Sequence, residues 1–211
     1  MTAAGLRRFV PAGDDQPAVP PDPAHRCELC SADVPDQHGH VVDLENRGLL
    51  CACRACWLLF VQDGAAGGRY RAVPERVLRV EDLGLSSGEW DALQVPVDLA
   101  FFLHSSATDQ IAGFYPSPAG ATECLLDLAA WRELAGGHPM LAEAQPDVEA
   151  VLLRRGGGVV ECFVVPVDVC YELVGRMRLL WQGFDGGQEL RTALSVFFTA
   201  LRARSRPWAA S

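Results

Sequence analysis

The sequence predicts an α+β protein: an N-terminal zinc-ribbon-like β-hairpin module, followed by an α+β domain with antiparallel strands and C-terminal helices. Two Cys-x2-Cys pairs, Cys27/Cys30 and Cys53/Cys56, flank 22 residues, which is enough for a short hairpin. Downstream, apolar strand-like runs alternate with helical patterns. The composition, 49% hydrophobic and 21% charged, is that of a globular protein. No apolar run approaches the roughly 18 residues of a membrane helix, so we expect no membrane insertion.

Composition divides the chain into five parts. The first 24 residues are rich in Pro, Ala and Asp, which predicts a disordered tail. Five of the eight cysteines then fall between residues 25 and 61. The expected parts are a tail at 1–24, a zinc-ribbon-like metal module at 25–61, a linker and packing segment at 62–84, an α+β domain at 85–204 and a tail at 205–211.

Short-range patterns predict the elements of the α+β domain. Ser86 and Glu89 have the spacing of a capping box, which starts a short helix. Three successive glycines at 156–158 predict a turn between two apolar runs. We expect antiparallel strand pairs at 95–103 with 110–115, ended by Pro116, and at 148–154 with 159–165. We expect helices at 125–134, from Pro166 to about 181, and from a cap at Asp185 to about 201.

The cysteine pairs predict a tetrahedral metal site. A Cys-x2-Cys pair on a tight turn directs two thiolates to one ion, and two pairs complete an S4 site. Residues 40–45 and 49–53 are expected to form the hairpin that brings the pairs together. The predicted ligands are Cys27, Cys30, Cys53 and Cys56. Three neighbours are alternative ligands: Cys51, which would share a strand face with Cys53, and His38 and His40.

The expected cofactor is Zn²⁺, with iron as the alternative. A closed site of four thiolates suits either ion. Rubredoxins hold iron with two such pairs but usually have Gly directly after each pair, where this chain has Ser31 and Trp57. Residues 1–24 lack the apolar stretch of a secretory signal, so we expect a cytoplasmic location. Closely spaced cysteines there bind metal more often than they form disulfides or remain as buried thiols.

Charge argues against nucleic acid as a partner. The formal net charge is −9, and residues 25–61 hold three Arg against five acidic residues. Residues 81–150 hold 12 acidic residues against one Arg, which suits docking of a protein. We expect a protein partner to contact Trp57, Phe60, Trp181 and Phe184. No catalytic residues are predicted, because His104, the serines after it and Asp109 lack the context of a hydrolase nucleophile.

Several stretches of sequence carry a resemblance to a known family. They are Cys27-Glu-Leu-Cys30, His40-Val-Val-Asp-Leu44 and Leu50-Cys-Ala-Cys-Arg-Ala-Cys56, then Phe114-Tyr-Pro-Ser-Pro-Ala-Gly-Ala-Thr-Glu123, Val165-Pro-Val-Asp-Val-Cys-Tyr-Glu-Leu173 and the loop 181–187. Over residues 25–204 the chain resembles an uncharacterised bacterial domain family, common in actinobacteria. The resemblance implies a gene beside those of uptake [NiFe]-hydrogenases. It brings no catalytic residues with it.

Two hypotheses of function follow. The first is a non-enzymatic accessory protein with a structural zinc ribbon, whose partner is a [NiFe]-hydrogenase subunit or maturation factor. The second is a rubredoxin-like iron protein that uses the same cysteines for electron transfer or oxygen protection. A thiol-based enzyme that uses Cys51 is a third, weaker hypothesis.

Overall fold

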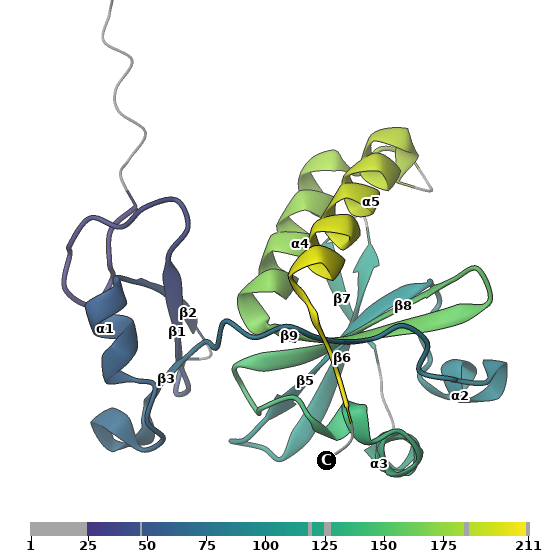
Figure 1. The fold of residues 1–211 in the computed structure, drawn as a ribbon, viewed down its shortest axis with the longest axis horizontal. Helices are drawn as coiled ribbons and strands as arrows, with labels where there is room; N and C mark the ends of the chain where they lie inside the picture. Colours follow the sequence, from purple (N-terminus) through teal and green to yellow (C-terminus); the bar gives the residue numbers. More distant parts are fainter. Residues whose placement is uncertain (1–24, 47, 118–119, 125–127, 184–185, 210–211) are drawn as a thin grey trace, which may run out of the picture.

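The computed structural model describes residues 25–46, 48–117, 120–124, 128–183 and 186–209, which form two sheets and several helices (Figure 1). Strand pairing in both sheets is antiparallel, except for one two-residue parallel pair. The two longest described helices follow the last long strand of the larger sheet. The expected α+β class, with antiparallel strands and C-terminal helices, is therefore confirmed.

The smaller sheet has the strand order β2-β1-β3. β1 (Gly39–Asp43) and β2 (Gly48–Ala52) form the predicted hairpin, with His40 opposite Cys51. β3 (Tyr70–Ala72) pairs with the other edge of β1, after helix α1 (Arg54–Leu59) and the 3-10 turn η1 (Ala65–Gly68). We call residues 25–73 the ribbon module. Segment 62–84, expected to link and pack the two parts, supplies β3 to this sheet and β4 to the larger one.

The larger sheet has seven strands in the order β10-β4-β9-β8-β5-β6-β7. Its centre is the pair β8 (Glu149–Gly156) and β9 (Val159–Pro166), joined by the predicted glycine turn. β5 (Leu99–Ser105) and β6 (Gln110–Ser117) form the other predicted pair. The remaining strands are short: β4 (Leu78–Val80), β7 (Gly120–Cys124) and β10 (Arg206–Pro207).

Helices cover both faces of the larger sheet (Figure 1). On one face lie α2 (Ser87–Ala92), α3 (Leu128–Gly137) and the 3-10 turn η2 (Pro139–Ala142); on the other lie α4 (Val167–Leu180) and α5 (Gly187–Arg204). Phe102 packs against Trp131 of α3, with ring centroids 4.7 Å apart. Phe163 packs on the opposite face against Phe198 of α5, at 6.0 Å. Because both faces are covered, the central strands are continuous apolar runs.

The ribbon module packs against the α+β domain through a small apolar cluster and several polar contacts. β1 reaches the first turn of α4, where His40 Nδ1 lies 2.8 Å from Asp168 Oδ2. Arg71 of β3 donates to the carbonyl of Pro146 at 3.0 Å. The buried members of the apolar cluster are Val42, Val73, Val148 and Val167.

Three details of the larger domain differ from the prediction. β6 runs through Pro116 to Ser117 and pairs with β7, a strand that the sequence did not predict. At Pro116, β6 pairs with β7 but not with β5, because β5 pairs only with β6 residues 110–114. The missing N–H of Pro116 therefore leaves no gap in the pairing between β5 and β6. Helix α3 continues through the glycines at 136–137. Residues 206–207, expected within a tail, form β10.

Two further expectations concern the termini of helices and the membrane. The capping box at Ser86 and Glu89 is confirmed, with reciprocal hydrogen bonds at the start of α2. Asp185, expected to cap the last helix, lies outside the described residues, and Gly186 is the N-cap of α5. Among the described helices, none is both long enough and apolar enough to span a bilayer.

Candidate metal centre

Four cysteine side chains from distant parts of the ribbon module meet at one point. The Sγ atoms of Cys27, Cys30, Cys53 and Cys56 all lie within 4.8 Å of one another, and those of Cys30 and Cys53 are 3.7 Å apart. In a tetrahedral site with Zn–S bonds of about 2.3 Å, neighbouring sulfurs are about 3.8 Å apart. A disulfide bond is only about 2.0 Å long. The spacing is thus that of ligands around one ion, and this donor set suits Zn²⁺ and iron alike.

The two cysteine pairs are positioned by different local structures. Cys27 and Cys30 lie on a turn closed by a hydrogen bond from the N–H of Ser31 to the carbonyl of Cys27 (2.7 Å). Ser31 has φ +62°, a left-handed conformation that glycine adopts more easily, so the turn forms without a glycine at this position. Cys53 is instead the N-cap of α1, and the N–H of Cys56 points at its sulfur at 3.5 Å. The second pair is therefore held in the first turn of a helix, whereas the first pair is held on an isolated turn.

Crowding affects the ionisation of three of these thiols in different directions. Burial is the strongest influence on Cys27 and raises its pKa, but the N–H groups of Cys53 and of its own turn outweigh burial and lower the pKa to about 6. Burial and then the neighbouring thiols raise the pKa of Cys56 to about 12. The N–H of Ala32 lowers the pKa of Cys30, but the contact with Cys27 leaves it raised overall. A divalent cation removes this conflict because it stabilises every thiolate at once.

The three alternative ligands form a separate group. One ring nitrogen each of His38 and His40 and the Sγ atom of Cys51 lie within 4.8 Å of one another. Burial, followed by the carboxylate of Glu28, raises the pKa of Cys51. Cys51 was expected to share a strand face with Cys53 and compete for the four-thiolate site. It does not join that cluster because β2 ends between the two residues and the chain turns into α1.

Comparison with known protein families identifies the chain. Residues 26–205 match the model of a family of unknown function, DUF5947. The chain belongs to this family. The match includes the ribbon module and the larger sheet with its helices, so both parts of the DUF5947 protein are covered by one family model. No curated protein and no solved structure matches the chain.

Trp57 and Phe60, which the sequence suggested as partner contacts in the ribbon module, pack against residues of the same module. The indole N–H of Trp57 donates to the carbonyl of Val73 at 2.9 Å, and the Phe60 ring packs against Tyr70 at 5.3 Å. Both aromatic side chains are half-buried. The exposed apolar side chains of this segment are Leu58, Leu59 and Val61, at 53%, 66% and 47% of their full exposure. An uninterrupted apolar run at 57–61 was the sequence signal for them.

The second expected partner surface lies between α4 and α5. Trp181 is half-buried, and its indole N–H donates to the carbonyl of Gly183 at 3.0 Å. Phe184 lies outside the described residues. The described part of this loop closes through a bridge between Gln182 and Gly186.

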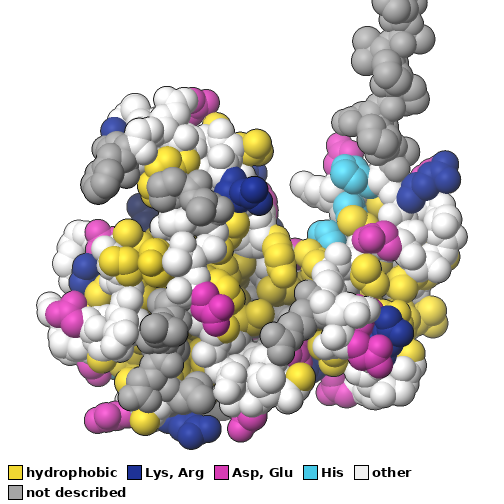
Figure 2. All heavy atoms as spheres, turned by 180° about the vertical axis from the view of Figure 1, so that it is seen from behind, with side chains coloured by type: hydrophobic (Ala, Val, Ile, Leu, Met, Phe, Trp, Pro, Cys, Tyr) yellow, Lys and Arg dark blue, Asp and Glu magenta, His cyan; other side chains and the backbone are white. Residues whose placement is uncertain are grey.

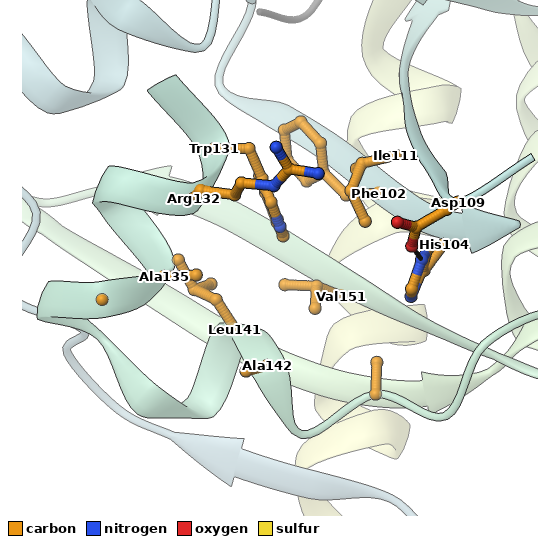
Figure 3. Close-up of a pocket in the computed structure, with 12 residues that line it drawn as sticks. Phe102, His104, Asp109, Ile111, Trp131, Arg132, Ala135, Leu141, Ala142 and Val151 are labelled. Atoms are coloured by element: carbon orange, nitrogen blue, oxygen red, sulfur yellow. Dashed lines mark hydrogen bonds and ion pairs between the residues drawn. The ribbon is translucent and has the colours of Figure 1, made fainter. Parts of the chain in front are cut away.

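A pocket of about 470 Å³ lies on the face of the larger sheet that α3 covers (Figure 3). Its apolar floor includes Phe102 and Trp131, and the Arg132 guanidinium extends over it. At one end His104 Nε2 and Asp109 Oδ1 are 3.0 Å apart. The described residues that line the pocket include no serine or cysteine.

Proposed function

We propose that this DUF5947 protein is a non-enzymatic accessory protein, in which a structural Zn²⁺ held by four cysteines organises a surface for docking a protein partner. The observation that carries the proposal is the convergence of four Sγ atoms within 4.8 Å. A site closed by four protein ligands leaves no position for a substrate, which is typical of structural zinc.

Two of the four proposed metal ligands and two of the exposed apolar residues lie at the same short helix. Cys53 and Cys56 begin α1, and Leu58 and Leu59 occupy its last turn. A six-residue helix is not stable by itself, so its ligation to zinc would fix the apolar side chains in place. α1 lies on the side of the ribbon module away from the larger domain, where a partner can reach it (Figure 1).

The partner that we propose is a [NiFe]-hydrogenase subunit or maturation factor. This part of the proposal rests on the resemblance of the cysteine motifs and of residues 114–123 and 165–173 to a bacterial family encoded beside uptake hydrogenases. We also propose a cytoplasmic location, since a site of four free thiolates persists best in a reducing compartment.

The metal assignment is tested by purifying the protein anaerobically from metal-replete cells and measuring zinc, iron and sulfide per chain. We expect zinc without iron or sulfide, and loss of this zinc when Cys53 and Cys56 are both changed to Ser. Cys162→Ala, which alters a buried thiol of the larger domain, is the control and should keep the metal. Iron with a visible chromophore would favour the rubredoxin-like alternative. Unchanged metal content in the double variant would refute a site at these cysteines.

The docking surface is tested with two matched charge substitutions. Leu59→Glu alters the proposed surface, whereas Leu179→Glu alters a leucine on α4 that is 85% exposed, more than Leu59 at 66%. Neither should change folding, because neither side chain is buried. We expect co-purification with hydrogenase subunits or maturation factors to be lost with Leu59→Glu and retained with Leu179→Glu. Equal binding by both variants would remove α1 from the proposal, and absence of binding by the wild-type chain would remove the hydrogenase partner.

A further inference from the structure

A second group of metal-binding side chains lies in the ribbon module, apart from the four-cysteine cluster. His40 of β1 faces Cys51 of β2 in the hairpin register, and His38 directly precedes β1. The rings of His38 and His40 have centroids 4.8 Å apart. One nitrogen of each ring and the Cys51 sulfur lie within 4.8 Å of one another, the same limit that holds for the four cysteines. Two imidazoles and a thiolate are a donor set that zinc accepts.

Hydrogen bonds to both histidines leave the same ring nitrogen available to a metal. Nδ1 of His38 lies 2.8 Å from the carbonyl of Pro35, which can only accept, so this nitrogen carries the proton. Nδ1 of His40 lies 2.8 Å from the carboxylate of Asp168, which also accepts. In the neutral form of each ring, which is the form that binds a metal, the lone pair is therefore on Nε2. A histidine that binds zinc through one nitrogen usually donates from the other to a carboxylate or a backbone carbonyl, as both rings do here.

The Nε2 atom of His38 has no partner within the described part of the chain. It is buried from solvent and makes no hydrogen bond. An acceptor atom left buried without a partner loses its hydrogen bond to water, so such atoms are rare in folded proteins. A metal ion bound between His38, His40 and Cys51 would satisfy it.

We propose that His38, His40 and Cys51 form a second zinc site, distinct from the four-cysteine cluster, in which a water molecule completes the tetrahedron. Cys51 binds as the thiolate, and its proton passes to solvent when the metal enters. Three protein ligands and one exchangeable position distinguish this site from the closed four-thiolate site. With a single thiolate, the second zinc is held less tightly than the first.

The position of this site gives it a structural consequence. His40 belongs to the ribbon module, whereas Asp168 belongs to the first turn of α4 in the larger domain. The described histidine side chains of the module gather on the side that faces the larger domain (Figure 2). A zinc ion on Nε2 of His40 polarises the ring and strengthens the hydrogen bond from Nδ1 to Asp168. Occupancy of the site therefore stabilises the contact between the two parts.

The stoichiometry of zinc in the wild-type chain tests the proposal directly. We expect two zinc ions per chain after saturation and removal of excess metal. Titration with a chelator should remove the two ions in two steps, and the protein should stay folded after the first step. Zinc X-ray absorption of the loaded protein should show imidazole nitrogen as well as sulfur. One zinc ion per chain with only sulfur ligands would overturn the proposal, and this measurement needs no variant to fold.

Variants then locate the second ion. Cys51→Ser and His38→Gln should each bind one zinc fewer than the wild type, whereas His104→Gln, a histidine of the larger domain, should bind the wild-type amount. Cys53→Ser with Cys56→Ser tests the four-cysteine site separately, so the two proposals can fail independently. Full zinc content in the Cys51 and His38 variants would refute the assignment of these ligands.

Asp168 acts on this site as a positioning residue. Asp168→Asn should lower the affinity of the second zinc by about 10- to 100-fold, the usual effect of losing a carboxylate behind a metal-bound histidine. Asp109→Asn removes a matched histidine partner in the larger domain and should leave zinc affinity unchanged. If Asp168→Asn alters stability but not zinc affinity, the carboxylate has only a structural role and the predicted positioning is wrong.

Discussion

Replacement of Glu149 by Gln should destabilise the protein through one buried ion pair. The Glu149 side chain is fully buried at the start of β8. Its carboxylate accepts hydrogen bonds from Nε of Arg76 at 2.6 Å, from Nη2 of Arg76 at 2.8 Å and from the N–H of Gln145 at 2.9 Å. Arg76 belongs to the segment that connects the ribbon module to the larger domain. The pair therefore holds this connection against the central strand.

The size of this loss in stability follows from the Arg76 guanidinium, which glutamine leaves without a buried carboxylate partner. Glutamine has nearly the volume of glutamate, so no cavity forms, but its amide group would face the guanidinium with one donor too many. A charge-assisted hydrogen bond contributes about 1.5–3 kcal/mol, and an isolated buried charge costs about 3–5 kcal/mol. The side chain of Arg76 is 34% exposed and retains Glu143 as a partner, so water relieves part of this cost. We expect a loss of about 2–4 kcal/mol.

Urea unfolding of the zinc-loaded protein measures this loss. The control is Glu81→Gln, because Glu81 pairs with Arg79 at 2.7 Å but is 82% exposed. An exposed pair contributes about 0–1 kcal/mol, so the control should unfold near the wild-type midpoint. The Glu149→Gln midpoint should fall with an unchanged slope. A shift no larger than that of Glu81→Gln would show that burial does not set the strength of the pair, and would refute the reasoning.

Three other predictions concern acid, the hairpin and the buried thiols. The Arg69 guanidinium lowers the pKa of the Asp43 carboxyl from 3.8 to about 2. The stability that this carboxylate contributes is therefore present above pH 4 and is lost as the pH falls toward 2. Asp43→Asn should accordingly weaken the dependence of unfolding free energy on pH in this acid range. Gly39→Ala would place Cβ 2.8 Å from Cδ1 of Trp57 and should lower the free energy of unfolding by about 1–3 kcal/mol, measured by thermal unfolding. The control is Gly48→Ala, which has open space around the new Cβ and should change this free energy by less than about 0.5 kcal/mol. Cys162 and Cys170 should resist alkylation in the native protein, because burial raises the pKa of both thiols; rapid labelling detected by mass spectrometry would contradict this.

Local patterns in the sequence predicted the elements that depend on neighbouring residues. The capping box at Ser86 and Glu89 satisfies the helix start within four residues, so no distant contact is needed. The glycines at 156–158 fix a tight turn, and the apolar runs on either side pair across it. β7 was missed because its five residues carry no strong apolar pattern and depend on pairing with β6.

The cysteine spacing likewise predicted which four residues would meet, but not how each pair is held. Two Cys-x2-Cys pairs separated by 22 residues favour one tetrahedral site, and a short hairpin between them can bring the pairs together. Whether the second pair occupies a turn or a helix N-terminus depends on how α1 packs beside β1 and β3. The sequence signal for either conformation at residues 53–57 is weak.

The sequence by itself determined the α+β class, the hairpin and the four-cysteine cluster, because short-range spacing and apolar periodicity act over few residues. Only the tertiary structure decided that Cys51 leaves this cluster and joins His38 and His40, since the direction of a side chain depends on where β2 ends. Only the tertiary structure placed Asp168 behind His40, 128 positions away in the chain. No local pattern encodes such a contact, because it forms only when the ribbon module and α4 pack together.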